Sequence, residues 1–134
     1  QGKEPLDLAR TATVTASSFA EGAAPANVAN GWNRVVGKSR NAWAPAPQQR
    51  APHWIQLSLQ EPSAIREVHL TFEKQSADCK LESRRNGVWQ EIAAVQSQSG
   101  RRHVLKLKPV ETDALRLVAE NDSSFGVCEI RAYR

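Results

Sequence analysis

Apolar and polar residues alternate with a period of two along several short stretches of the chain. Thr11 to Ser17, for example, sets three apolar residues against three threonines. Such alternation is typical of strands with one buried face. The same pattern recurs in His53 to Leu59, Glu67 to Glu73, Val104 to Lys108, Leu115 to Ala119 and Val127 to Tyr133.

Two further runs flank Asn86-Gly87, a dipeptide that favours a tight hairpin turn with positive φ. The pattern therefore predicts about eight strands. Helix is expected only as a single turn near Pro25 to Ala29. An all-β domain of this kind is a two-sheet antiparallel sandwich or a barrel.

The segment from Ser18 to Pro52 interrupts this pattern. It contains two Trp, four Pro and four Asn, with little strand alternation. We expect an irregular loop that is packed by its own side chains. Loops of this length inside a compact domain are usually functional.

Length and composition indicate one folded domain over residues 1–134. The chain has 40% hydrophobic and 24% charged residues, which is a globular composition. The sequence begins with Gln1 and contains no Met, which predicts a fragment of a larger protein. No apolar run approaches the ~20 residues of a membrane span. The net charge of +4 is spread among interspersed acids, so nucleic acid is not an expected partner.

The sequence predicts no catalytic site. His53, His69 and His103 are expected on polar strand faces, and no Ser, Cys or Asp motif lies beside them. The glycines of Gly31 to Ser39 are spaced one residue too widely for a phosphate loop.

Cys79 and Cys128 lie too far apart in the sequence for structural zinc. They share the parity of inward residues on their strands, which allows either a disulfide or two buried thiols.

The four tryptophans differ in their surroundings. Trp54 and Trp89 lie in strand patterns, which favours core or sheet-face packing, and Trp43 is expected to fix the long loop onto the sandwich. Trp32 lies between Gly31 and Asn33 without periodic apolar neighbours. We therefore expect its ring to be exposed and available to a ligand.

Sugar binders combine a flat aromatic ring with hydrogen-bonding groups such as Arg, Asn and His, because sugars present C–H faces and hydroxyls. A second loop before the last strand offers another aromatic ring among small polar residues. The alternative is that Phe125 caps the core and that Trp32 folds back onto its own loop. The candidate ligand-binding residues are Trp32, Asn33, Arg34, Arg50, His53, Asn121 and Phe125.

The order of several segments resembles the discoidin family, the coagulation-factor C-type domains, and its sugar-binding relatives in carbohydrate-binding module family 32. The likeness extends over nearly the whole chain. The segments that carry it are Ala12 to Ser18, Asn27 to Gly31, Trp43, Pro52 to Leu57, Ile65 to Leu70, Gly87 to Trp89, Leu115 to Leu117 and Glu129 to Tyr133.

The resemblance implies a galactose-binding-like jelly-roll sandwich without catalysis, whose ligand lies on loops at one end. It also implies a secreted, periplasmic or cell-surface location and a parent catalytic domain in the same polypeptide. The segment from Asn30 to Trp43 is also similar to sandwich domains at the C-terminus of some bacterial flavin-dependent oxidoreductases, which is a second possible parent.

Members of this family often hold a structural calcium ion. Here the position that matches an aspartate is Asn30, so the site would lose a full negative charge. Calcium is the one cofactor that the resemblance implies. Its candidate ligands are Asn27, Asn30, Asn33, Ser39 and Glu129.

We therefore predict a non-catalytic module that binds glycan through loops at one end of the sandwich. One alternative is a structural or docking domain whose aromatic loops pack against the parent enzyme. The other is membrane-surface binding, for which Val35-Val36 is the candidate apolar tip. The sequence favours the membrane least.

Overall fold

A computed structural model describes residues 7–29, 42–121 and 124–134 of the chain. Two 3-10 turns, η1 (Leu8–Thr11) and η2 (Pro25–Ala29), accompany the strands. The antiparallel all-β prediction and the single turn near Pro25 are confirmed. In the described ranges the strands are β1 (Thr13–Ala16), β2 (His53–Phe72), β3 (Cys79–Arg85), β4 (Val88–Val95), β5 (Arg102–Ala119) and β6 (Val127–Tyr133).

The described residues contain six strands where the pattern indicated about eight, because two of the predicted pairs are each one continuous strand. β2 joins the runs that start at His53 and Glu67, and β5 joins those at Val104 and Leu115. The register of β2 against β5 shifts between Ser58 and Ser63 and again between Ile65 and Glu67. Bulges of this kind bend a strand without ending its pairing. The alternation of apolar and polar residues stops at each bend, whereas β2 and β5 continue through it.

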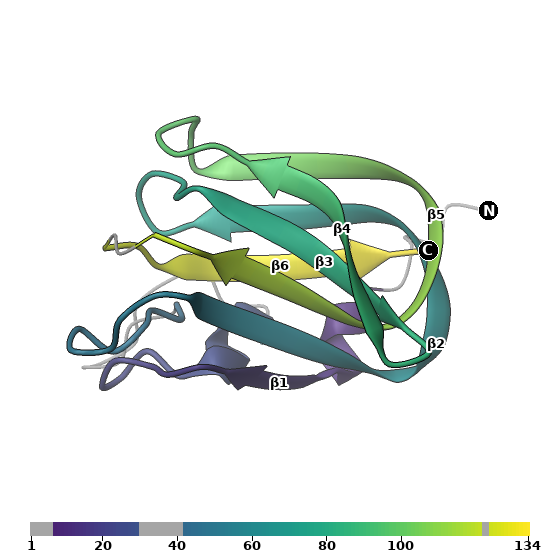
Figure 1. Cartoon of the computed structure of the whole chain (residues 1–134), viewed down its shortest axis with the longest axis horizontal. Coiled ribbons are helices and arrows are strands. Elements are labelled where there is room, and N and C mark those ends of the chain that lie inside the picture. The colour runs from purple at the N-terminus through teal and green to yellow at the C-terminus, as the bar shows by residue number, and fades with distance from the viewer. Residues whose placement is uncertain (1–6, 30–41, 122–123) are drawn as a thin grey trace.

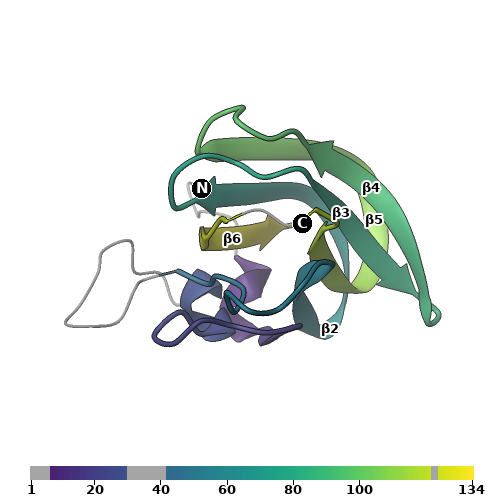
Figure 2. The same cartoon turned by 60° about the vertical axis from the view of Figure 1, so that its left-hand side comes forward.

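Because of these bends, β2 and β5 belong to both layers of the sandwich (Figure 1). In the first layer, the first half of β2 pairs with β1 and with the second half of β5, and the order continues through β3 to β4. In the second layer, the other half of β2 lies between β6 and the first half of β5. η2 contacts both β1 and β6, η1 contacts β6 and β2, and together they close the side between the two edge strands (Figure 2).

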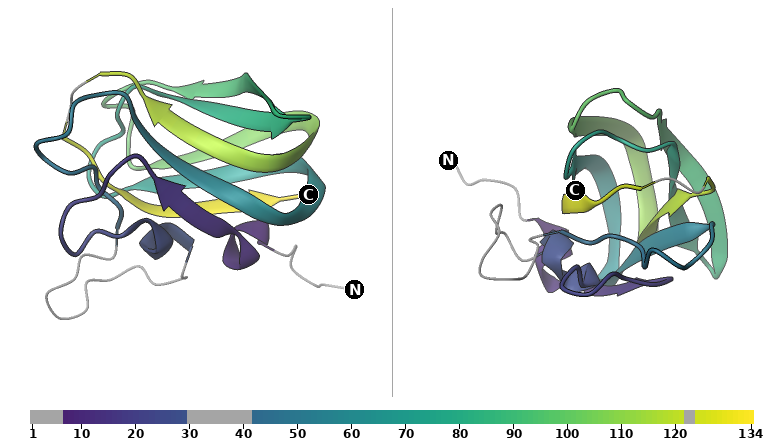
Figure 3. Two further views of the ribbon diagram at one scale, coloured as in Figure 1. Left: turned by 60° about the horizontal axis from the view of Figure 1, so that its bottom comes forward. Right: turned by 90° about the vertical axis from the view of Figure 1, so that its left-hand side faces the viewer.

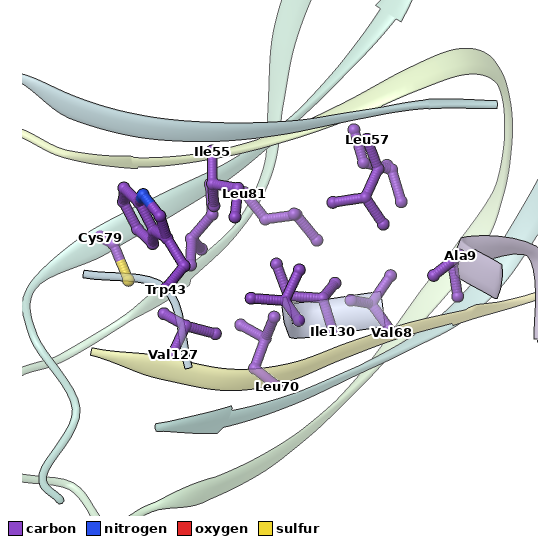
Figure 4. Packing of buried hydrophobic residues seen from close by; sticks show 14 of the residues in the cluster. Ala9, Trp43, Ile55, Leu57, Val68, Leu70, Cys79, Leu81, Val127 and Ile130 are labelled. Atoms are coloured by element: carbon purple, nitrogen blue, oxygen red, sulfur yellow. The ribbon is translucent and has the colours of Figure 1, made fainter. Parts of the chain in front are cut away.

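The core lies between the inward faces of the two layers, and every strand from β2 to β6 contributes to it. Figure 4 shows Ile55, Leu57, Val68, Leu70 and Ile130 pointing into the shared interior, where they belong to one buried cluster. Each of these side chains is at most 2% exposed. Burial of one such side chain contributes about 1.5–3 kcal/mol to folding. The period-two pattern of the sequence thus identifies the residues that stabilise the sandwich.

The two ends of the sandwich differ (Figures 1 and 3). One end, here called the loop end, gathers the described parts of the connections before β2 together with those between β2 and β3, β4 and β5, and β5 and β6. The other, here called the corner end, holds the bends of β2 and β5, the hairpin turn at Asn86-Gly87 and the C-terminus. Asn86 and Gly87 have φ of 53° and 77°, as the predicted turn requires. Within the described ranges, no helix has the length and apolar character needed to cross a membrane.

Candidate functional site

The loop end contains a cleft of about 550 Å³, here called the main cleft. One wall is the segment from Ala44 to Arg50, and the facing side is formed by Ser124 and Phe125. His53 and Ala20 complete the lining. Segments from distant parts of the sequence therefore meet in one hollow.

Phe125 is held in place by Trp43 beneath it. The two rings pack edge to face, with 5.7 Å between their centroids. Trp43 is itself only 1% exposed, and its Nε1 donates a 2.9 Å hydrogen bond to the carbonyl of Ser18. Its backbone also forms two 2.8 Å hydrogen bonds with Val127. The prediction that Trp43 fixes the long loop onto the sandwich is confirmed.

The wall from Ala44 to Arg50 is shaped by prolines and by hydrogen bonds to the preceding loop. Pro45 and Pro47 fix their own φ, and the amide of Ala46 donates to Ser18 Oγ at 3.1 Å. The amide of Gln49 donates to the carbonyl of Ala46 at 3.0 Å and closes a turn. The cleft is therefore formed before any ligand arrives.

His53 and Arg50 place an imidazole and a guanidinium in the lining of the main cleft. His53 is 4% exposed, and its ring centroid lies 6.3 Å from that of Phe125. Its expected place on a polar face is wrong, because it shares the inward parity of Ile55 at the start of β2. Arg50 is exposed at the rim and carries five N–H donors. The exposed Arg50 can meet the hydroxyls of a polar ligand, and His53 contributes a largely buried ring to the lining.

The structure thus brings three of the sequence-predicted ligand residues together: Arg50, His53 and Phe125. Asn121 is exposed after the end of β5 and does not line this cleft. Trp32, Asn33 and Arg34 lie outside the described residues, so their role stays a prediction. Val35-Val36, the candidate membrane tip, lies outside them as well.

Several residues of the main cleft were missed by sequence reasoning. Gln48, Gln49 and Ser124 line it and carry amide or hydroxyl groups. Phe19 is 53% exposed and directly precedes Ala20 of the lining. The high density of Pro and Gln residues in the irregular segment was the signal that could have indicated a site. The sequence did not show which of these residues face the cleft.

Two of the predicted calcium ligands can be placed. The side-chain amide of Asn27 donates to the carbonyl of Ala42 at 3.0 Å, and the carboxylate of Glu129 pairs with Arg131 at 2.8 Å. The described residues contain no group of three or more His, Cys, Asp or Glu side chains arranged to hold a metal. This described part of the donor set does not by itself form a cage for a hard cation. Asn30, Asn33 and Ser39 lie outside the described residues, and calcium stays a prediction.

Trp54 and Trp89 lie away from the main cleft, on the outer face of the first layer. The guanidinium of Arg116 lies 4.9 Å from the Trp54 ring centroid and 4.0 Å from that of Trp89. Its Nη2 also donates to Gln56 Oε1 at 3.0 Å. The prediction of sheet-face packing is confirmed for both indoles. Each ring makes a cation–π contact with the guanidinium of Arg116.

Cys79 and Cys128 are both free thiols. The two thiols are therefore not joined, and Cys79 is buried as the pattern predicts, whereas Cys128 is only half-buried. Burial raises the pKa of the Cys79 thiol to about 12, and the neighbouring Asp78 charge adds to the effect. The pKa of Cys128 is also raised, again mainly by burial.

The F5/8 type C domain model matches residues 13–132 of the sequence. A comparison with curated proteins gave no match. Among solved structures, a mutant of chitosan-binding module 1 from the chitosanase/glucanase of Paenibacillus sp. IK-5 superimposes with a TM-score of 0.83. It is 18% identical and covers 98% of this chain and 100% of that chain.

Two more solved structures are similar in the same way. The family 32 module of Clostridium perfringens NanJ, in complex with galactose, has a TM-score of 0.81 and 11% identity over 97% of this chain and 98% of that one. SpGH29 has a TM-score of 0.79 and 22% identity over 96% of this chain, but this chain spans only 28% of its length. These likenesses show a shared fold. Because the family model covers nearly the whole sequence, the chain belongs to the F5/8 type C, or discoidin, domain family.

Proposed function

We propose that this domain is a non-catalytic carbohydrate-binding module and that the main cleft receives the sugar. The observation that carries the proposal is the meeting of Phe125, Arg50 and His53 in one preformed cleft at the loop end. A sugar needs both an apolar surface for its C–H face and directional partners for its hydroxyls. The main cleft offers both.

Each of these residues has a separate role in the proposal. Phe125, fixed by Trp43, packs against the C–H face of a sugar ring. Arg50 at the rim donates to hydroxyl oxygens, and His53 at the inner side sets the orientation. Gln48 and Gln49 add amide groups that can donate and accept. A single sugar ring makes few contacts in such a cleft, so we expect dissociation constants of roughly millimolar to micromolar.

The similar structures support this proposal without deciding the ligand. They include modules whose own descriptions name chitosan, galactose and GalNAc-β-1,3-galactose. A module of this kind tethers an enzyme to its substrate, so a catalytic domain in the same polypeptide is the proposed partner. A secreted, periplasmic or cell-surface location follows from that role.

The test is a glycan array, followed by calorimetry with the best glycan on three variants. Phe125→Leu keeps apolar volume but removes the ring, and Arg50→Ala removes the rim donors. Each is expected to weaken binding about tenfold or more, since each removes at least one principal contact. Arg85→Ala is the matched control, because Arg85 is an exposed arginine at the corner end. It should bind as the wild type does.

Two outcomes would overturn the proposal. Equal binding by all three variants would place the glycan elsewhere on the domain. A silent array combined with tight association to a parent catalytic domain would favour a docking role instead. Melting temperatures of the variants show whether a loss of binding reflects the site or a loss of folding.

A further inference from the structure

A second cleft opens at the loop end, beside the main cleft. Its volume is about 400 Å³, and it is lined by the segments 73–77, 97–98 and 124–126. Ser124 and Phe125 line both clefts, and no other described residue does. This pair therefore forms the ridge between two adjacent hollows.

The walls of the second cleft are held by Ser76, which is 4% exposed. Its Oγ donates to the carbonyl of Gln96 at 2.7 Å and accepts from the amide of Ser99 at 3.0 Å. Its backbone carbonyl accepts from the amide of Gln98 at 3.0 Å. The loop before β3 and the loop before β5 are thus fastened to each other. A cleft with fixed walls loses little conformational freedom when a ligand binds.

A further hydrogen bond fastens this wall to the ridge. The amide of Glu73 donates to the carbonyl of Gly126 at 2.7 Å, directly after Phe125. Phe125 is held from the other side by the edge-to-face contact with Trp43. Two contacts from different parts of the fold therefore hold the ridge between the two hollows in place.

The exposed side chains of the second cleft are polar. Gln75 and Gln98 bring amides, Ser97 brings a hydroxyl, and Lys74 brings an ammonium group. An acyl chain or an aliphatic side chain would leave these groups without partners. Sugar hydroxyls would satisfy them, because they both donate and accept hydrogen bonds.

From this geometry we infer that the two clefts act together and bind two contiguous sugar residues of an oligosaccharide, with the linkage crossing Ser124 and Phe125. The inference rests on the proposed function, and it adds the class of ligand: an oligosaccharide in preference to a single sugar. The residue in the main cleft makes the contacts described above. The next residue in the second cleft is recognised by Gln75, Ser97 and Gln98.

The experiment compares short and long forms of the same sugar by calorimetry. One probe pair is galactose with GalNAc-β-1,3-galactose, and the other is glucosamine with its trimer. The pair that binds is then measured on Gln75→Ala, which removes an amide, and on Ser97→Trp, which fills the second cleft. Gln90→Ala is the matched control, because Gln90 is an exposed glutamine on β4.

The wild type is expected to bind the longer form about tenfold more tightly, which corresponds to two or three added hydrogen bonds. Ser97→Trp should remove this advantage, Gln75→Ala should reduce it severalfold, and Gln90→Ala should keep it. Affinity for the single sugar should not change in any of the three. Their melting temperatures confirm folding.

The outcomes that overturn the inference are distinct from failure of the proposed function. If the single sugar and the longer form bind equally, the main cleft acts alone and the proposed function stands. If the advantage survives Ser97→Trp, the added residue lies outside the second cleft. If neither form of any sugar on the array binds, the proposed function itself fails, and this inference fails with it.

Discussion

The chain reverses direction at both the loop end and the corner end of the sandwich, but the structural elements that reverse it differ between the two ends. At the corner end, β2 and β5 bend at shifts in register and are paired on both sides of each shift, and the Asn86-Gly87 turn joins β3 to β4 in two residues. At the loop end, irregular segments are tied by side chains to backbone groups, chiefly by Ser18, Trp43 and Ser76.

This difference shows where a sandwich can place a site. A strand that bends at a bulge keeps most of its backbone groups paired within the sheet. The corner end does have a cleft of about 280 Å³, but there Arg84 and Asp113 form a 2.9 Å ion pair. Side-chain fastening at the loop end leaves larger hollows with exposed polar groups. We therefore expect substitutions at the corner end to change the free energy of unfolding, and substitutions at the loop end to change glycan affinity.

Trp43 is the exception, because it should affect both properties. Trp43→Ala removes a fully buried indole and its hydrogen bond to Ser18, and it leaves Phe125 without support. We expect the free energy of unfolding to fall by about 3–5 kcal/mol. Glycan binding should be lost as well. Urea denaturation and calorimetry measure the two effects.

Trp43→Phe is the control, since it keeps an aromatic ring but cannot donate to Ser18. It should lose a smaller part of the stability and retain measurable binding. If Trp43→Ala weakened neither property, the loop end would be held by other contacts and the comparison of the two ends would fail.

At the corner end, Thr112 is the sharpest test, because its side chain bonds backbone groups and is 1% exposed. Its Oγ1 accepts from the amide of Arg84 at 3.1 Å and lies 2.8 Å from the carbonyl of the same residue. Thr112→Val removes the hydroxyl at nearly constant volume. The amide of Ala114, which is fully buried, donates to the same hydroxyl at 3.2 Å. We expect a loss of about 2 kcal/mol in the free energy of unfolding, because this buried amide loses a partner.

Glycan affinity should not change in Thr112→Val, because no part of either cleft involves this residue. Thr112→Ser keeps the hydroxyl and should recover most of the stability. A change in glycan affinity at the loop end would contradict the independence of the two ends.

The sequence was sufficient for the fold because burial in this sandwich follows the period of two. Ile55 and Leu57 alternate with polar neighbours, and both are buried as the pattern predicts. The same period did not predict that β2 and β5 continue through their bends. There, β2 and β5 continue through Pro62 and Pro109, because a shift in register accommodates the missing donor.

The candidate site was predicted in part for a similar reason. Phe125 and His53 could be found because aromatic and imidazole groups stand out among small polar residues. Gln75 and Ser97 could not, because they have no periodic pattern and their place depends on how Ser76 fastens two loops from distant parts of the chain. Contacts of that kind depend on tertiary geometry, which local spacing does not encode.

The smallest expected effect is the pH dependence of stability that results from the buried thiol of Cys79. Cys79 opens β3, two residues after Ala77 of the second cleft, and it is 5% exposed. Its pKa is about 12 in the folded protein, against an ordinary value of 9.0. The unfolded chain therefore loses this proton at lower pH, so the stabilising contribution is complete below about pH 9 and is lost as the pH rises to about 12.

At pH 10 the cost to the free energy of unfolding should be about 1 kcal/mol. The measurement is urea denaturation at pH 7 and pH 10 for two proteins: a Cys128→Ala background, and the same background with Cys79→Ala. Other alkaline titrations are common to both proteins and cancel in the comparison. The protein that keeps Cys79 should lose about 1 kcal/mol more stability between the two pH values. An equal loss in both would mean that the thiol titrates normally, and hence that the clefts admit water to the base of β3.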